Sequence, residues 1–164
     1  MIKIFMAALL LVTMVFAGCG GDTPAKTDGG AAEETKITIG LDDEYAPMGF
    51  KNEQNEIVGF DVDLAKEAAK RLNSKVEFKA IDWNSKEAEL KSGRIDIIWN
   101  GLDITPERQE NMLFSDPYMD NRQIVFVKKG NDQGIAAEAD LAGKGIGTQA
   151  GSTAETYIDG NETL

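Results

Sequence analysis

One short stretch of the chain combines a turn, an acid and an arginine that could together hold a zwitterion. Residues 95–99 have the apolar composition of a buried strand, and Gly101 follows them as a tight turn. Thr105 is a good N-cap for a helix that begins directly after it. Arg108 offers a planar fork that matches a carboxylate, and Asp103 could take an ammonium group. The stretch therefore suits a free α-amino acid.

Two alternatives require no ligand at this stretch. Arg108 could simply pair with Glu107 or Asp103 at the surface, where ion pairs contribute little. Gly101 could be needed only because the backbone there has a positive φ. The rest of the sequence has to decide between these readings.

The composition excludes several kinds of chemistry. The chain has 164 residues, of which 42% are apolar, and this is enough for a packed core. Its formal net charge of −11 argues against nucleic acid as a partner, because a phosphate binder needs a basic face. It contains no histidine and one cysteine, which excludes a histidine-based triad, a histidine metal site and an intrachain disulfide. We expect no cofactor and no metal.

The N-terminus has the pattern of a secretory signal. Lys3 is followed by an apolar run too short to span a membrane as a helix, and small residues precede Cys19. This ending resembles a lipobox, in which the cysteine is lipid-modified and becomes the first mature residue. An ordinary cleaved signal with an incidental cysteine is the alternative. We predict a signal peptide over residues 1–18, a lipidated, palmitate-bearing Cys19, and a flexible tether over residues 19–35.

The rest of the chain alternates strands and helices, as a parallel doubly wound α/β fold does. Strands are predicted at residues 36–41, 76–81, 95–99, 123–128 and 145–148. Helices are predicted at residues 62–72, 85–91, 136–141 and 154–158, with a further helix opening after Thr105. A small hairpin is predicted over residues 48–60, and Asp61 is expected to cap the helix that follows it.

The first three strands each end in a polar or aromatic loop. In open α/β sheets, ligands bind outside the carboxyl ends of the strands, so the loops at residues 42–47, 82–84 and 100–108 predict one ligand edge. The strand at residues 95–99 is expected to be central because it is largely apolar. A second strand–glycine–helix junction at residues 149–153 repeats the logic of the first, with backbone N–H groups directed at an anion.

In this order, the motifs resemble those of the family-three extracellular solute-binding proteins, which deliver polar amino acids to ABC importers. The matching pieces are Gly59-Phe60-Asp61-Val62-Asp63-Leu64, Asp82-Trp83, Gly93-Arg94-Ile95-Asp96, Asn100-Gly101, Thr105-Pro106-Glu107-Arg108, Phe114-Ser115-Asp116-Pro117-Tyr118 and Gln149-Ala150-Gly151-Ser152. The resemblance implies a type-two periplasmic-binding-protein fold of two doubly wound lobes. It implies lobe one over residues 36–122, and a hinge strand with an incomplete lobe two over residues 123–164, so we expect a C-terminally truncated chain.

The resemblance also implies a set of ligand-binding residues. They are Asp42, Tyr45, Trp83, Asn100, Gly101, Asp103, Arg108, Gln149, Ser152 and Thr153. By this resemblance, Arg108 would hold the α-carboxylate of the ligand, and the Gly101 carbonyl and Asp103 would hold its α-ammonium. Tyr45 and Trp83 would sandwich the ligand side chain, although ordinary core or rim aromatics remain the alternative.

The remaining implied residues lie around the ligand side chain and on the facing turn. Asp42 would touch the tip of the side chain, and Gln149 would set selectivity. Ser152 and Thr153 would add to carboxylate binding. An acid at Asp103 departs from the Thr or Ser that many family members carry there, and could either strengthen ammonium binding or pair with Arg108.

These expectations describe a monomeric, extracytoplasmic, lipid-anchored protein that binds a polar or cationic amino acid for the membrane subunits of an ABC importer. The alternative is an enzyme on the same scaffold, either a cyclohexadienyl-dehydratase-like protein or the binding lobe of a cell-wall lyase. A sensory ligand domain is a third possibility. The sequence shows no nucleophile–base pair, so we predict binding without catalysis.

Overall fold

The structure of the protein is a computed structural model that describes residues 35–162 and residue 164. The predicted signal peptide, Cys19 and the tether up to residue 34 lie outside the described residues, so these predictions stay predictions. Within the described part of the chain, every helix falls short of the length and apolarity that a bilayer crossing requires.

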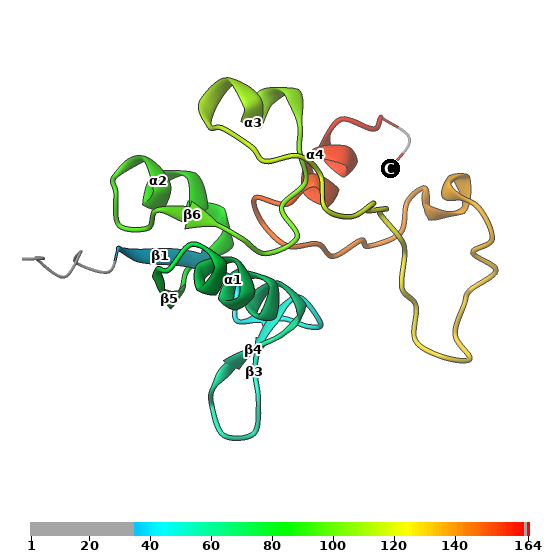
Figure 1. The fold of residues 1–164 in the computed structure, drawn as a ribbon. Coiled ribbons are helices and arrows are strands. Elements are labelled where there is room, and N and C mark those ends of the chain that lie inside the picture. Colours follow the sequence, from blue (N-terminus) through cyan, green and yellow to red (C-terminus); the bar gives the residue numbers. More distant parts are fainter. Residues whose placement is uncertain (1–34, 163) are drawn as a thin grey trace, which may run out of the picture. The chain divides into compact units, whose positions relative to one another are not determined.

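A parallel three-stranded sheet carries the loops that were expected to form the ligand edge (Figure 1). Its order is β5–β1–β6, and the strands are β1 (Lys36–Leu41), β5 (Lys75–Ala80) and β6 (Ile97–Ile98). Polar and apolar residues alternate at the start of β1, and Ile39 and Leu41 are buried in the core. The predicted strands at residues 36–41 and 76–81 are therefore confirmed, within one residue at each end.

The third predicted strand is shorter than expected, and it is not central. Among the described residues, β6 pairs only with β1, whereas β1 is paired on both edges. Ile95, at the start of this apolar run, is buried against β1 rather than paired within the sheet. A Cβ on Gly40 would lie only 2.5 Å from Cδ1 of Ile95, so the glycine leaves the room in which Ile95 packs on β1. The prediction of a central strand was wrong because apolar content reports burial and not position in the sheet.

A second, antiparallel sheet follows β1 directly. Its strands are β2 (Glu44–Tyr45), β3 (Gly49–Lys51) and β4 (Ile57–Val58), in that order. The pairing of β3 with β4 confirms the predicted hairpin. The pairing of β2 with β3 was not expected, because residues 42–47 were predicted as a loop. This pairing fixes Tyr45 next to the end of β1.

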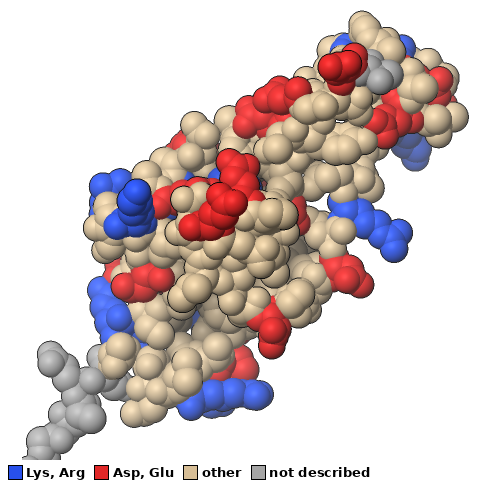
Figure 2. All heavy atoms as spheres, turned by 90° about the horizontal axis from the view of Figure 1, so that it is seen from above, with Lys and Arg blue, Asp and Glu red and all other residues tan. Residues whose placement is uncertain are grey.

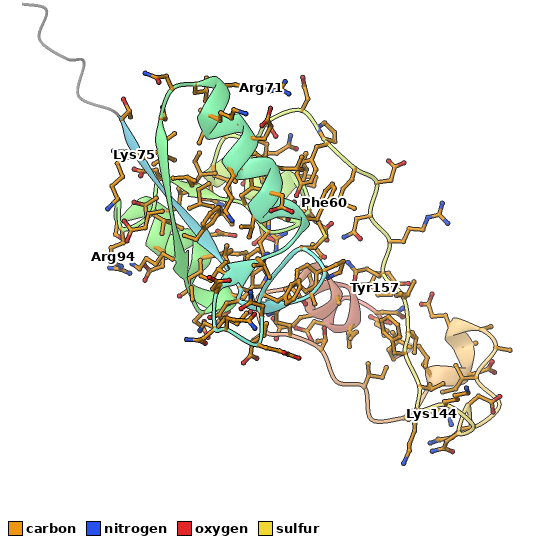
Figure 3. The ribbon with its side chains drawn as sticks, turned by 60° about the horizontal axis from the view of Figure 1, so that its bottom comes forward. Phe60, Arg71, Lys75, Arg94, Lys144 and Tyr157 are labelled. Atoms are coloured by element: carbon orange, nitrogen blue, oxygen red, sulfur yellow. The ribbon has the colours of Figure 1, made fainter. Side chains whose placement is uncertain are left out.

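The helices that follow are α1 (Phe60–Arg71), the 3-10 helix η1 (Trp83–Ser85), α2 (Lys86–Lys91) and α3 (Pro106–Asn111). Of these, α1 packs against β5, and α2 packs against β1 and β6 (Figures 1 and 3). Phe60 and Arg71 mark the two ends of α1 in Figure 3. Thr105 caps α3 as predicted, since its hydroxyl accepts from the Arg108 backbone N–H at 3.3 Å.

The predicted cap of α1 is wrong. The N-cap is Gly59, which has φ +135°, and Asp61 lies inside the first turn with its side chain buried. A Cβ on Gly59 would lie 2.4 Å from the Met48 carbonyl oxygen, so only glycine fits this close approach. Asp61 is on the face of the helix that also buries Ala65 and Ala69, and it is turned to the interior rather than to the helix end.

Residues after 122 form less regular structure than the sequence predicted. In the described residues they contribute the 3-10 helix η2 (Glu138–Leu141) and α4 (Thr153–Asp159), the latter confirming the last predicted helix. The predicted strands at residues 123–128 and 145–148 are absent from this part of the chain, which runs as the long yellow and orange loop of Figure 1. A strand needs a hydrogen-bonding neighbour, and Phe126 is 85% exposed without one. Tyr157 (Figure 3) joins α4 to η2 by donating to Glu138 at 2.8 Å.

Candidate ligand-binding site

A cavity of about 420 Å³ lies between the loops that follow the parallel strands and the segment that leads into α4. Every residue predicted to bind the ligand lines this cavity except Asp42. These residues are Tyr45, Trp83, Asn100, Gly101, Asp103, Arg108, Gln149, Ser152 and Thr153. Asp42 lies beside them, because its carboxylate accepts a hydrogen bond from the Gln149 side-chain amide. The structure thus brings together residues that are up to 111 positions apart (42 to 153).

The buried side chain of Asp61 accepts a hydrogen bond from the Gly101 turn and fixes its backbone. Gly101 has φ +57°, and its N–H donates to Asp61 Oδ2 at 2.6 Å. Asp61 Oδ1 accepts in turn from the Tyr118 hydroxyl at 2.9 Å. Asp61 is 1% exposed, and burial raises the pKa of its carboxyl while the bonds from Tyr118 and Gly101 lower it. Burial and the neighbouring Asp61 carboxylate also raise the pKa of Tyr118.

Asp61 and Tyr118 were not among the predicted site residues. The sequence carried a signal for Asp61, because it stands four and eight positions before the buried Ala65 and Ala69 on one helix face. An acid on an apolar face indicates a buried partner rather than a cap. Tyr118 had no comparable signal, since only the fold brings it next to α1.

Arg108 is 8% exposed and points its guanidinium toward backbone carbonyls. Nη1 donates to the Asp103 carbonyl at 3.0 Å, and Nη2 donates to the Gly151 carbonyl at 3.1 Å. The Glu87 carboxylate lies 3.8 Å from Nε. The surface pairing with Glu107 or with the Asp103 side chain, which the sequence left open, does not form. A buried fork directed at neutral carbonyls is able to take an anion in the cavity.

The Asp103 carboxylate receives hydrogen bonds from three uncharged donors. They are the Asn121 amide at 2.6 Å, the Gln123 amide at 3.3 Å and the Thr153 hydroxyl. None of these partners cancels its negative charge. The cavity therefore carries a cation at Arg108 and an anion at Asp103, the combination that a zwitterion requires.

Three predicted residues use their polar groups inside the protein. The Asn100 side chain is buried and accepts from the Asp42 backbone N–H at 3.0 Å, which fixes the loop after β1. The Ser152 hydroxyl caps α4 by accepting from the Glu155 N–H at 3.2 Å. Gln149 donates to Asp42, as described above. Their side chains shape the cavity wall, and the polar groups named here are already hydrogen-bonded. The Asn100 side-chain nitrogen, by contrast, is buried without a hydrogen-bond partner in the described residues.

Aromatic and aliphatic side chains form the apolar part of the wall, among them Tyr45, Trp83, Phe126, Met48 and Ile124. Tyr45 comes from β2 and is 42% exposed, and Trp83 opens η1 after the Asp82 cap. Asp82 fixes this turn because its carboxylate accepts from the Ser85 N–H at 3.2 Å. In the part of the chain that the structure describes, no group of three or more acidic, cysteine or histidine side chains gathers in a way that would hold a metal ion.

The comparisons with known proteins match the same region. Residues 37–157 match the family described as bacterial extracellular solute-binding proteins, family 3. The arginine-binding extracellular protein ArtP of Bacillus subtilis is 36% identical over 144 residues, covering 88% of this chain and 54% of the relative. The histidine-binding periplasmic protein of Salmonella typhimurium is 41% identical over 133 residues, covering 80% of this chain and 50% of the relative.

Solved structures are similar over the same part of the chain. An ABC uptake transporter substrate binding protein from Streptococcus pneumoniae, with bound histidine, superposes with a TM-score of 0.72 at 43% identity. The match covers 76% of this chain and 50% of that structure. The chain spans about half the length of the relatives that it matches.

Proposed function

The chain belongs to the bacterial extracellular solute-binding proteins of family 3, and from this premise we propose that it binds a free polar or cationic α-amino acid for delivery to an ABC importer. The observation that carries the proposal is the placement of the buried Arg108 and of Asp103 on one cavity of about 420 Å³. That volume lies in the range of small-molecule sites.

Each end of the ligand has a partner of suitable chemistry. Arg108 binds the α-carboxylate, and Ser152 and Thr153 flank it on the facing turn. The Gly101 carbonyl and Asp103 bind the α-ammonium, with Asn100 supporting the loop beside them. Since the present partners of Asp103 are neutral, an ammonium group gains a charge-assisted bond there.

The ligand side chain lies between Tyr45 and Trp83 and ends near Asp42 and Gln149. The relatives are named for arginine and histidine binding, and these ligands carry a basic side chain. An acid at the end of the side-chain subsite suits such ligands, and aromatic walls suit a planar cation. Gln149 must release Asp42, or share it, when a cationic side chain arrives.

The protein binds its ligand and does not transform it. The relatives described above are binding proteins by name, and the cavity-lining residues are placed to bind rather than to transfer protons. We further propose that the protein is monomeric and extracytoplasmic, anchored by a lipidated Cys19. Residues 36–122 would form lobe one, and residues 123–164 would form the connection to lobe two and part of that lobe. On the face shown in Figure 2, basic side chains stand among acidic ones rather than in one continuous stripe, which does not suit nucleic acid.

A thermal-shift panel of the twenty common amino acids tests the proposed function. A ligand present at 100 times its Kd should raise the free energy of unfolding by about 2.7 kcal/mol, which moves the melting temperature by several degrees. We expect shifts of this size for at least one polar or cationic amino acid, and none for the matching concentration of a sugar. If no amino acid at millimolar concentration raises the melting temperature, the proposal fails.

A further inference from the structure

Lys86 is a buried lysine next to the cavity that the proposed function does not use. It is the first residue of α2 and is 3% exposed, whereas lysine side chains are normally at the surface. Its ammonium donates to the Gly151 carbonyl at 2.8 Å and to the Trp83 carbonyl at 3.3 Å. It also lies 5.2 Å from the centre of the Trp83 ring. Among the described residues, no carboxylate forms an ion pair with this ammonium group, and the Glu87 and Glu155 carboxylates favour its charge only from a greater distance. The two carbonyls and the Trp83 ring are therefore the direct contacts that offset the cost of burying it.

The Gly151 carbonyl is shared by two cations. It accepts from Lys86 and also from Arg108 Nη2, at 2.8 and 3.1 Å. One uncharged oxygen on the turn of residues 149–153 therefore joins both buried cations of the opposite wall. Burial lowers the pKa of Lys86, and the charge of Arg108 lowers it further. The two cations repel each other, and the partial negative charge of the shared Gly151 oxygen offsets part of this repulsion.

The turn approaches η1 too closely for a side chain at position 151. Gly151 has φ +72°, and a Cβ there would lie 2.9 Å from the Cα of Asn84. The Gly151 N–H is fixed by the Glu155 carboxylate at 2.6 Å, so the carbonyl is presented in a defined direction. The backbone of Gly151 thus packs directly against the backbone of Asn84, and the Lys86 ammonium adds a hydrogen bond to the Gly151 carbonyl.

We propose that Lys86 is a positioning residue that holds the turn of residues 149–153 over the cavity through the Gly151 carbonyl and so slows the release of the ligand. This role rests on the proposed function, since it concerns the same cavity. The turn carries Gln149, Ser152 and Thr153, which line the cavity. When the turn moves away, the Lys86 ammonium regains water, and when the turn returns, it must be desolvated and bonded again. Lys86 therefore stabilises the conformation in which the turn of residues 149–153 lies over the cavity, and not the conformation in which the turn has moved away.

The test compares Lys86→Met, which keeps the length of the side chain and removes its charge, with Lys91→Met at the exposed end of the same helix. Amide hydrogen exchange is measured at residues 149–153 in the purified protein without added amino acid. We expect exchange to be faster by about tenfold or more in Lys86→Met, because a hydrogen bond to a charged group is lost. We expect no change in Lys91→Met and partial recovery in Lys86→Arg. Equal exchange in Lys86→Met and the wild type overturns the proposal.

Two further measurements keep the proposal distinct from the proposed function. With an amino acid found in the thermal-shift panel, the dissociation rate should rise by about tenfold in Lys86→Met while the association rate changes little. If the wild type binds no amino acid, the proposed function fails, but the exchange comparison still decides the role of Lys86. If Lys86→Met does not fold, labelling of the wild type with an amine-reactive reagent decides it. Lys86 should then react at least about tenfold more slowly than Lys91, because its amine is buried beneath the Gly151 carbonyl and reacts only when the turn opens, and equal rates contradict the proposal.

Discussion

Replacement of Arg108 by Met is expected to weaken amino-acid binding by about a hundredfold or more, since loss of one partner of a buried charge pair costs about 2–5 kcal/mol. Arg108 is buried in the cavity wall, and its fork is directed at two backbone carbonyls rather than at a carboxylate of the protein. The Glu87 carboxylate lies 3.8 Å from Nε, whereas an arriving carboxylate would hydrogen-bond to the two Nη groups that now donate to neutral carbonyls. Methionine fills similar space and offers no donor.

Titration calorimetry with the amino acid that gives the largest thermal shift measures this effect. Arg71→Met is the control, because Arg71 is an exposed arginine at the end of α1 (Figure 3), paired only with Glu67. Arg108→Lys should bind more tightly than Arg108→Met but less tightly than the wild type, since a lysine keeps the charge and loses the fork. A Kd for Arg108→Met within threefold of the wild type would show that the carboxylate lies elsewhere.

Replacement of Asp61 by Ala is expected to lower the free energy of unfolding by about 2–4 kcal/mol, because it leaves buried donors without an acceptor. The Gly101 N–H and the Tyr118 hydroxyl both depend on this carboxylate, which is 1% exposed. The loss also frees the Gly101 turn that supports the ammonium end of the cavity. Urea unfolding at pH 7, followed by tryptophan fluorescence, measures the change.

Asp61→Asn is the matched variant, because its amide oxygen can still accept from Gly101 and its amide nitrogen can donate to the Tyr118 oxygen. It should lose less than half as much stability as Asp61→Ala. Burial raises the pKa of Asp61, so the folded protein takes up this proton at a higher pH than the unfolded chain does. The stability that Asp61 contributes should therefore rise as the pH falls through the folded-state pKa, and Asp61→Asn should lack this component. If Asp61→Ala unfolds at the same urea concentration as the wild type, Asp61 does not support the turn.

The elements that could be predicted from sequence are those fixed by local chemistry. β1 and β5 follow from the alternation of apolar and polar residues, and the start of α3 follows from the Thr105 cap and the Pro106 after it. The positive φ at Gly101 follows from the need for a turn between a strand and a helix. In each case the residues that determine the structure are neighbours in the chain.

The wrong predictions concern partners that are distant in the sequence. Residues 123–128 have the β-branched and aromatic content of a strand, but in the described residues they have no strand to pair with. Asp61 was read as a cap because acids are common at helix starts, whereas the fold places it beneath Gly101 and Tyr118. The helix at residues 85–91 was predicted, but its local sequence does not indicate that Lys86 is buried and bonded to Gly151. Such contacts cannot be read from propensity.

In the candidate site too, the local features were predictable and the contacts between distant residues were not. The order of motifs along the chain predicted the residues that line the cavity, and the structure brings nearly all of them to it. What each side chain bonds to was not predictable. Asn100 holds the backbone of Asp42, and Ser152 caps α4. The groups that remain for a ligand are thus fewer than the sequence suggested, and Arg108 and Asp103 are the central ones.

The most direct test of this account is a calorimetric comparison of amino acids with their decarboxylated amines. L-arginine and agmatine form one pair, and L-histidine and histamine form another, each keeping the side chain and losing the α-carboxylate. If Arg108 holds that carboxylate, at least one of these amino acids, or another from the thermal-shift panel, should bind, and its amine should bind about a hundredfold more weakly. Equal affinity for an amino acid and its amine, or no binding of any amino acid, would contradict the account.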